Sequence, residues 1–335
     1  MPLPSELPIV QAPMAGGPST PELAAAVSAA GGFGYVAAGY LSPDALSTAL
    51  ARTRELTSAP IGVNLFVPSP DRADPDEIAD YARVLAPLAR ALGVEPGDPR
   101  WDDDAYQAKL DLVTETDVHT VSFTFGCPTP QTINRLRRKA IEVAVTVTNA
   151  EEARQASDAG ADSLVVQGTE AGGHQGTFDG RTPNHTALLD ALASIRGATD
   201  LPLVAAGGIM TSEDAVAALH VGAVAVQVGT ALLCATEAGT SAVHREALLT
   251  RRYPGTVITR AFSGRWARGL ANRFATGHPD APAGYPQIYH MTRPLRAAAT
   301  KAADPDVPNL WSGTGWRDVA AADAATIVGR IASGL

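Results

Sequence analysis

Eight short apolar runs recur along the chain, and longer amphipathic segments separate them. The runs are rich in Val, Ile and Leu and are apolar on both faces, which is typical of buried parallel strands. The predicted strands cover residues 7–12, 33–38, 61–66, 118–123, 141–146, 162–167, 201–206 and 223–228. The pattern therefore predicts a parallel sheet that is covered on both sides.

The segments between these runs carry helix signals. The stretch "PELAAAVSAAG" follows Thr20 and ends at glycine, and in "TSEDAVAALHVG" Asp214 stands three residues after Thr211, the spacing of a capping box. Eight strands with seven crossovers favour a (β/α)8 TIM barrel, an α/β fold. A doubly wound open sheet shows the same alternation and remains the alternative.

Two segments exceed what a minimal barrel needs. Residues 67–104 are rich in Pro and Asp and contain one helical pattern, and residues 236–304 follow the eighth strand. We expect a barrel over residues 1–235 and a smaller, mainly helical cap over 236–304, in which "RWARGLANRF" is counted among the helical stretches. A C-terminal helix within 305–335 is expected to return and close the barrel.

Composition and charge narrow the class of protein. The 335 residues carry a net charge of −9, which argues against nucleic acid or an anionic membrane as partner. Neither a signal peptide nor a membrane-spanning stretch is recognisable, so we expect a cytoplasmic protein. Cys127 and Cys234 are too few for a disulfide scaffold and lack metal-ligand spacing, so no metal site is expected.

The ends of the seventh and eighth predicted strands indicate a phosphate site. Gly207 and Gly208 follow the seventh strand, and Gly229 and Thr230 follow the eighth. Glycines let backbone N–H groups approach a ligand closely, and these two loops form the usual phosphate site of a barrel. Each pair alone could simply form a tight turn. Because the two loops are neighbours in a barrel, this alternative explains both pairs together less well.

Two amides stand at other strand ends on the same rim. Asn64 and Gln167 each end an apolar run, and an amide that both donates and accepts suits the pyrimidine edge of a flavin. A turn residue with satisfied hydrogen bonds is the alternative for each. The motif GxGxxG is absent, so a Rossmann dinucleotide site has no support.

Several stretches together resemble one family. "PIVQAPMAGG", "GGFGYVAAGY", "VNLFVP", "QGTEAGGHQG", "AAGGI" and "GAVAVQVGTALL" occur in the order found in the nitronate monooxygenases, also called 2-nitropropane dioxygenases. The resemblance implies FMN as cofactor, with these contacts: Met14, Asn64, Gln167, Gly172, Gly173, Gly207, Gly208, Gln227, Gly229 and Thr230. FMN is expected rather than FAD because the sequence offers one phosphate site and none for an adenosine half.

The resemblance also assigns the histidine in "EAGGH". His174 matches the active-site histidine of the family, and Gly172 and Gly173 are expected to let its loop pass against the flavin ring. An exposed loop histidine is the alternative. His174 is expected to stabilise an anionic nitro group or to act as a base on a neutral nitroalkane.

The late stretch "GYPQIYHMTRPLR" resembles the subgroup that needs no nicotinamide cofactor (class I). Tyr285, Tyr289 and Arg293 are spaced to share one helix face and are expected to line the substrate pocket, and Pro294 is expected to stop that helix. The implied reaction uses O2 to oxidise an alkyl nitronate, propionate 3-nitronate above all, to a carbonyl compound and nitrite or nitrate. Arg293 or Lys109 is expected to face its carboxylate.

Two rival functions remain open from the sequence. One is an NAD(P)H-dependent flavin reductase acting on a quinone or an enoyl thioester, because related barrels catalyse that reaction. The other is a barrel that binds flavin without catalysis. Under the nitronate interpretation, the expected partners are a small nitronate and O2. The protein is expected to be a monomer or a homodimer.

Overall fold

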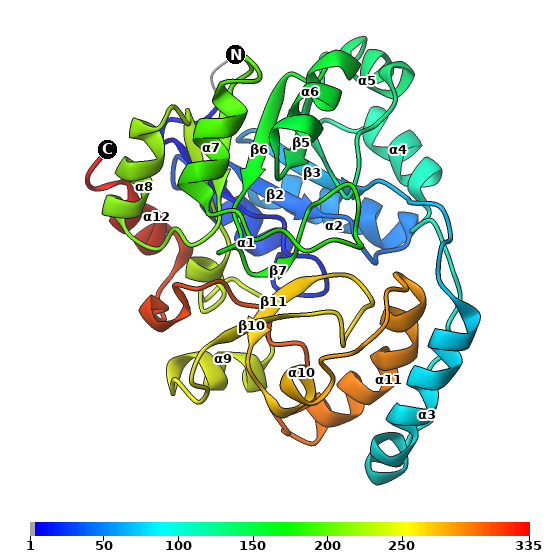
Figure 1. Cartoon of the computed structure of the whole chain (residues 1–335). Coiled ribbons are helices and arrows are strands. Elements are labelled where there is room, and N and C mark those ends of the chain that lie inside the picture. The colour runs from blue at the N-terminus through cyan, green and yellow to red at the C-terminus, as the bar shows by residue number, and fades with distance from the viewer. Residues whose placement is uncertain (1–3) are drawn as a thin grey trace.

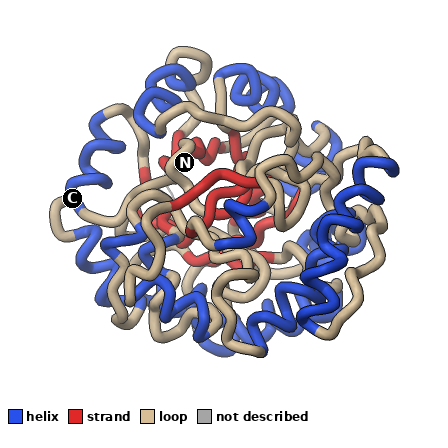
Figure 2. The backbone as a smooth tube through the Cα atoms, turned by 60° about the horizontal axis from the view of Figure 1, so that its bottom comes forward, coloured by secondary structure: helices blue, strands red, loops and turns tan. Residues whose placement is uncertain are grey.

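A ring of eight parallel strands forms the centre of the computed structural model, which describes residues 4–335 (Figures 1 and 2). The hydrogen-bonded order is β1-β9-β8-β6-β5-β4-β3-β2, and Val10 of β1 pairs with Phe33 just before β2, which closes the ring. The strands are β1 (Ile9–Gln11), β2 (Gly34–Ala37), β3 (Ile61–Phe66), β4 (Thr120–Thr124), β5 (Glu142–Val147), β6 (Ser163–Gln167), β8 (Leu203–Ala206) and β9 (Ala225–Val228). The predicted (β/α)8 barrel is confirmed, because in an open sheet the first and last strands, β1 and β2, would not pair with each other.

Helices surround the ring, and most begin where the sequence predicts (Figure 2). They are α1 (Pro21–Ala29), α2 (Pro43–Leu56), α4 (Tyr106–Thr114), α5 (Pro130–Arg137), α6 (Ala150–Ala159), α7 (Leu188–Arg196), α8 (Ser212–His220) and α12 (Ala324–Ala332). The side chains of Thr20, Ser42 and Thr129 each accept a hydrogen bond from the first turn of a helix that starts with proline. Thr211 and Asp214 form the expected capping box at α8.

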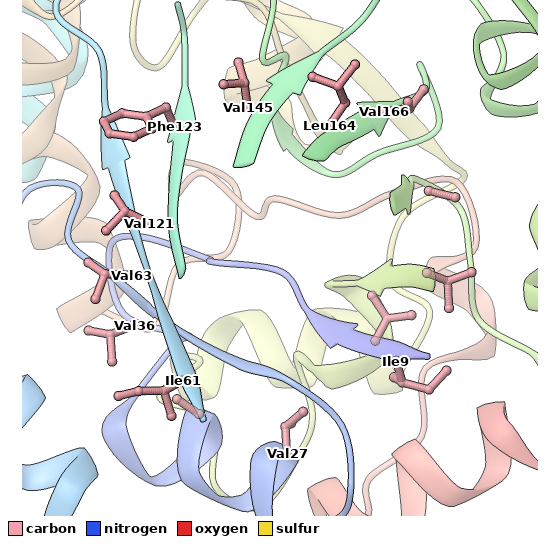
Figure 3. Packing of buried hydrophobic residues seen from close by; sticks show 14 of the residues in the cluster. Ile9, Val27, Val36, Ile61, Val63, Val121, Phe123, Val145, Leu164 and Val166 are labelled. Atoms are coloured by element: carbon pink, nitrogen blue, oxygen red, sulfur yellow. The ribbon is translucent and has the colours of Figure 1, made fainter. Parts of the chain in front are cut away.

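Alternate strand residues build two apolar layers. Ile9, Val63, Val121, Val145 and Leu164 pack outward against the helices (Figure 3). Their neighbours in sequence point into the barrel, where a separate cluster contains Val10, Tyr35, Ala144, Val165 and Val204. Because successive side chains of a strand point to opposite faces, a strand buried on both sides is apolar throughout.

The cap contains more strand than expected. Its elements are α9 (Ala242–Leu249), β10 (Thr256–Thr259), β11 (Ala267–Leu270), α10 (Arg273–Gly277) and α11 (Gln287–Lys301). The stretch "RWARGLANRF", expected to be helical, contains β11, so that expectation is wrong. β11 pairs with β10 on one side and on the other with β7 (Gly173–His174), which comes from the loop after β6. Such long-range pairing leaves no trace in the local pattern of residues.

Pro294 does not stop α11, contrary to expectation. The helix continues to Lys301, and α3 (Pro75–Leu92), the helix of the 67–104 segment, lies beside it (Figure 1). Proline removes one hydrogen bond within the helix. The missing N–H would have bonded the His290 carbonyl, and the N–H of Gly97, in the loop after α3, donates to the neighbouring Met291 carbonyl at 2.9 Å.

The C-terminal segment is helical only at its end. α12 packs against α1 and α8, whereas residues 305–323 contain only the short helix η2 (Trp316–Asp318) among the elements described. This stretch runs beside η1 (Thr230–Leu232), and the Gly313 N–H donates to Thr230 Oγ1 at 2.9 Å. Within residues 4–335, no helix combines the length and apolar character that a membrane crossing requires.

Candidate active site

A cavity of about 410 Å³ lies between the carboxyl ends of the strands and the cap. All ten residues that the sequence suggests for the cofactor line it, and so do His174 and Tyr289. Tyr285 and Arg293 instead line a second cavity of about 470 Å³ next to it. We call these the inner and the outer cavity. Tyr40, Phe66, Phe125 and Tyr289 line both and so form the wall between them.

Backbone geometry at Gly207 and Gly208 explains why glycine stands there. Their φ angles are +123° and +74°, in the left-handed region that other residues rarely adopt. A Cβ on Gly208 would lie 3.0 Å from the Cβ of Glu170. The loop therefore depends on glycine to present its backbone to the inner cavity, directly before the N-terminus of α8.

Gly172 packs closely against the C-terminal segment. A Cβ there would lie 2.6 Å from the Ser312 carbonyl carbon, so its missing side chain makes room for the C-terminal segment. Gly173 has φ +77°, and a Cβ there would meet open space. Of the two glycines, Gly173 therefore leaves free space at the cavity, and Gly172 permits close packing.

The side-chain amides of Asn64 and Gln167 differ in their hydrogen-bond partners. The Asn64 amide donates to Ser122 Oγ at 2.9 Å and to Thr124 Oγ1 at 3.0 Å. The Gln167 amide donates to the His174 carbonyl at 3.2 Å and accepts from the Gly176 N–H at 2.7 Å. Gln167 therefore also fixes the loop that carries His174.

A hydrogen bond to Ser263 holds the imidazole ring of His174. Its Nε2 lies 2.8 Å from Ser263 Oγ, whose hydroxyl donates to the Arg265 carbonyl at 3.2 Å. This contact fixes the orientation of the ring, and one of its two nitrogens carries the lone pair of the neutral form.

Burial and two guanidinium groups keep His174 uncharged. Burial, followed by the positive charges of Arg265 and Arg296, lowers the pKa of His174 to about 3. The rings of Phe125, Tyr285 and Trp311 surround the imidazole, with centroids 5.4–5.8 Å from its own. At neutral pH the imidazole of His174 is thus uncharged and lies among aromatic rings and near two guanidinium groups.

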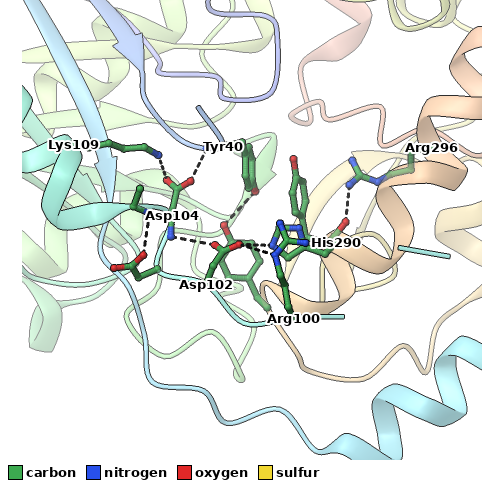
Figure 4. A network of polar contacts seen from close by, with 11 residues as sticks. Tyr40, Arg100, Asp102, Asp104, Lys109, His290 and Arg296 are labelled. Carbon is green, nitrogen blue, oxygen red and sulfur yellow. Dashed lines mark hydrogen bonds and ion pairs between the residues drawn. The ribbon is translucent and has the colours of Figure 1, made fainter. Parts of the chain in front are cut away.

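Lys109 does not line either cavity. Its side chain is 1% exposed, and its ammonium contacts Asp104 Oδ2 at 2.7 Å and the Ala38 carbonyl at 2.9 Å (Figure 4). The Asp104 carboxylate also accepts from the backbone N–H of Tyr40 at 3.0 Å. Tyr40 has φ +68° and stacks on Tyr289 with ring centroids 4.2 Å apart. The expectation that Lys109 faces the substrate is therefore not met, and the ion pair instead supports the aromatic wall.

Sequence reasoning missed several residues of the site. Arg296 lines the inner cavity, and Ser263 and Arg265 surround His174. Arg296 was missed because the helix was expected to end at Pro294. The available signal was the second arginine in "TRPLR", which follows Arg293 by about one helical turn. Ser263 and Arg265 lie in the turn "SGR" before β11, whose position only the pairing with β7 defines.

The donor set of the inner cavity fits the predicted FMN. Thr240 Oγ1 and His244 Nε2 line it and are buried without a partner among residues 4–335. Burial lowers the pKa of His244 to about 4, so this group too is uncharged. Unpartnered buried polar atoms cost free energy, so they indicate a ligand with hydroxyl or similar groups. A ribityl phosphate chain carries such groups.

Comparisons with known proteins agree with this architecture. A model of the family "Nitronate monooxygenase" matches residues 4–331. A probable nitronate monooxygenase of Staphylococcus saprophyticus is 38% identical, over 91% of this chain and 88% of that protein, and one of Staphylococcus aureus is 36% identical over 97% and 93%. Among solved structures, a nitroalkane oxidase from Streptomyces ansochromogenes shares 45% identity with a TM-score of 0.95, over 99% and 96% of the two chains. FabK from Thermotoga maritima shares 26% identity with a TM-score of 0.77, over 98% and 93%.

The fold and cavity define a barrel enzyme whose site lies at the carboxyl ends of the strands. The match over nearly the whole chain identifies the class: the chain belongs to the nitronate monooxygenase family, and the resemblance inferred from the sequence motifs is confirmed.

Proposed function

We propose that this enzyme uses FMN and O2 to oxidise alkyl nitronates to a carbonyl compound and nitrite, with propionate 3-nitronate as the preferred substrate. The observation that carries the proposal is the position of His174, an uncharged imidazole on the wall of a cavity that also contains every predicted cofactor contact. The family match and the neighbouring nitroalkane oxidase support oxidation of nitronates or nitroalkanes.

When bound, FMN supplies the electron transfer and the reaction with O2. The residues suited to hold it are the glycines after β8 and β9 with Thr230 at the phosphate, and the amides of Asn64 and Gln167 at the ring. The backbone N–H groups near Gly207 and Gly208 bind an anion without a charged side chain.

His174 is suited to act on a neutral nitroalkane as a proton acceptor, since its imidazole is uncharged and its orientation is fixed by Ser263. Loss of the proton makes the nitroalkane an anion, and the positive charge of Arg265 stabilises that anion. This charge disfavours an imidazolium unless an anion lies beside it. Proton transfer to His174 is thus coupled to formation of the nitronate.

One assay tests the proposal. The purified protein, incubated in air with propionate 3-nitronate, is expected to release nitrite, and flavin released by heat is expected to run as FMN on chromatography. The His174→Ala variant is the control for the site. Absence of nitrite from a protein that carries its flavin contradicts the proposal, and FAD in the extract contradicts the cofactor.

An NAD(P)H-dependent flavin reductase is the second candidate, which the sequence leaves open. Anaerobic mixing with NADH separates the two functions. Rapid bleaching of the flavin favours the reductase, whereas bleaching by a nitronate alone favours the proposed oxidation.

A further inference from the structure

Arg296 is the one residue with a permanent charge on the wall of the inner cavity, within the described part of the chain. No Asp, Glu or Lys of residues 4–335 lines that cavity. We infer that Arg296, rather than Arg293, binds the carboxylate of the substrate and thereby selects nitronates with an acidic tail. This inference rests on the proposed function, and it adds the residue that determines the substrate class.

Three hydrogen bonds fix the guanidinium of Arg296. Its Nε donates to Thr292 Oγ1 at 3.1 Å, one Nη to Asn309 Oδ1 at 2.8 Å and the other to the Tyr289 carbonyl at 3.1 Å. The group also lies over the Tyr289 ring, 4.8 Å from its centroid. A guanidinium has five N–H donors, so two remain for a ligand. The group is therefore oriented before any ligand arrives, which reduces the entropy lost on binding.

No carboxylate neutralises this buried cation. Among residues 4–335, no Asp or Glu oxygen lies within 4.0 Å of the Arg296 guanidinium, and burial lowers its pKa. A buried charge without a counterion is costly, and a bound anion offsets that cost. Carboxylate and guanidinium also match in shape, because both are planar forks.

Arg296 and His174 line the same inner cavity and share no hydrogen bond. The reacting carbon belongs near His174, so an acidic group at the other end of a short carbon chain is the part left for Arg296. Propionate 3-nitronate has this form.

Arg293 provides a matched control on the same helix. It is exposed, lines the outer cavity and lies behind the wall that Tyr40 and Tyr289 form. Both arginines carry the same charge and stand three residues apart, so removing either changes the net charge equally. They differ in access to the inner cavity and in burial, so the melting temperature of each variant is measured beside its KM.

The first experiment compares Arg296→Met with Arg293→Met on propionate 3-nitronate and on propyl-1-nitronate, which lacks the carboxylate. We expect Arg296→Met to raise KM for the carboxylate substrate about tenfold or more, the scale of a lost charge-assisted contact, with little change for the other. Arg293→Met is expected to change both by less than about threefold. Equal losses on both substrates with Arg296→Met, or a selective loss with Arg293→Met, overturn the inference.

A second variant covers the case in which Arg296→Met does not fold. Asn309→Asp keeps the guanidinium and places a carboxylate where Oδ1 now lies, 2.8 Å from Nη1. The internal ion pair is expected to replace the substrate carboxylate, so KM for propionate 3-nitronate rises while the melting temperature is retained. An unchanged KM in a folded Asn309→Asp variant overturns the inference.

Binding of propionate, which does not react, separates this inference from the proposed function. Propionate is expected to quench the fluorescence of Trp311, which lines the same cavity, and its Kd is expected to rise at least tenfold in Asn309→Asp but not in Arg293→Met. This titration needs no turnover. If the wild type binds propionate through Arg296 but oxidises no nitronate, the proposed function fails and the anion site stands; equal Kd in all variants overturns the anion site.

Discussion

The barrel wall of the inner cavity contains the glycines and amides at the ends of β3, β6, β8 and β9, whereas the cap wall contains Arg296 and aromatic rings, to which the ends of β2, β3 and β4 add Tyr40, Phe66 and Phe125. On the barrel wall, we expect recognition to depend on backbone N–H groups, which Gly207 and Gly208 present through positive φ angles. On the cap wall, we expect recognition to depend on charge and shape. Under the proposed function, the barrel wall holds the cofactor and the cap wall selects what reacts with it.

The largest effect is expected from a change in the barrel wall. Gly208→Val forces a branched residue into φ +74° and places its Cβ 3.0 Å from Glu170 Cβ, so the loop must move and the protein is expected to purify without flavin or activity. The ratio of flavin to protein measures this. Gly222→Val is the control, since Gly222 has φ +100° but lies outside the cavity lining. Equal flavin loss in both variants would mean that strain alone is responsible.

The next effect concerns His174, which joins the two walls through the pairing of β7 with β11. His174→Ala is expected to keep its flavin and to lose about 10²-fold or more in kcat, the scale of a lost acid–base group. His220→Ala, at an exposed histidine of α8, serves as the control. Wild-type turnover of both a nitronate and a nitroalkane by His174→Ala would refute the role of this residue.

Lys109 tests the support behind the cap wall. Lys109→Met leaves the Asp104 carboxylate without its partner, and breaking a buried ion pair costs about 3 kcal/mol or more in the free energy of unfolding. Urea unfolding measures this, and the double variant with Asp104→Asn is expected to recover part of the loss. KM for propionate 3-nitronate is expected to stay unchanged in the folded protein. A selective rise in that KM would instead show that Lys109 contributes to substrate binding.

The smallest effect concerns pH. The pKa of His244 falls from 6.5 to about 4 on folding because burial disfavours its charge. Between pH 6.5 and about 4, His244 is therefore protonated in the unfolded chain but not in the folded chain. The free energy of unfolding decreases as pH falls through this range. At pH 5 the loss is about 2 kcal/mol for this residue. Urea unfolding at pH 7 and pH 5 is expected to show a smaller drop for His244→Gln than for the wild type; an identical drop contradicts the assignment.

Local patterns predicted the barrel because each of its elements depends on neighbours in sequence. The apolar runs, the caps at Thr20, Ser42 and Thr211, and the glycines at strand ends are all local signals, and the structure has an element at each. The cap was less predictable. Pro294 lies inside α11 with Gly97, from the loop after α3, contacting the interrupted turn, and β11 is a strand because β7 and β10 lie beside it.

The sequence by itself determined the fold, the family and the residues that gather at the strand ends, because period, caps and glycines act over a few residues. Tertiary structure decided which cation enters the inner cavity, that Lys109 is buried against Asp104, and that Ser263 orients His174. These outcomes depend on contacts between segments about 90 residues apart in the case of Ser263 and His174. Helix spacing gives the face on which an arginine lies, but only packing shows which cavity that face meets.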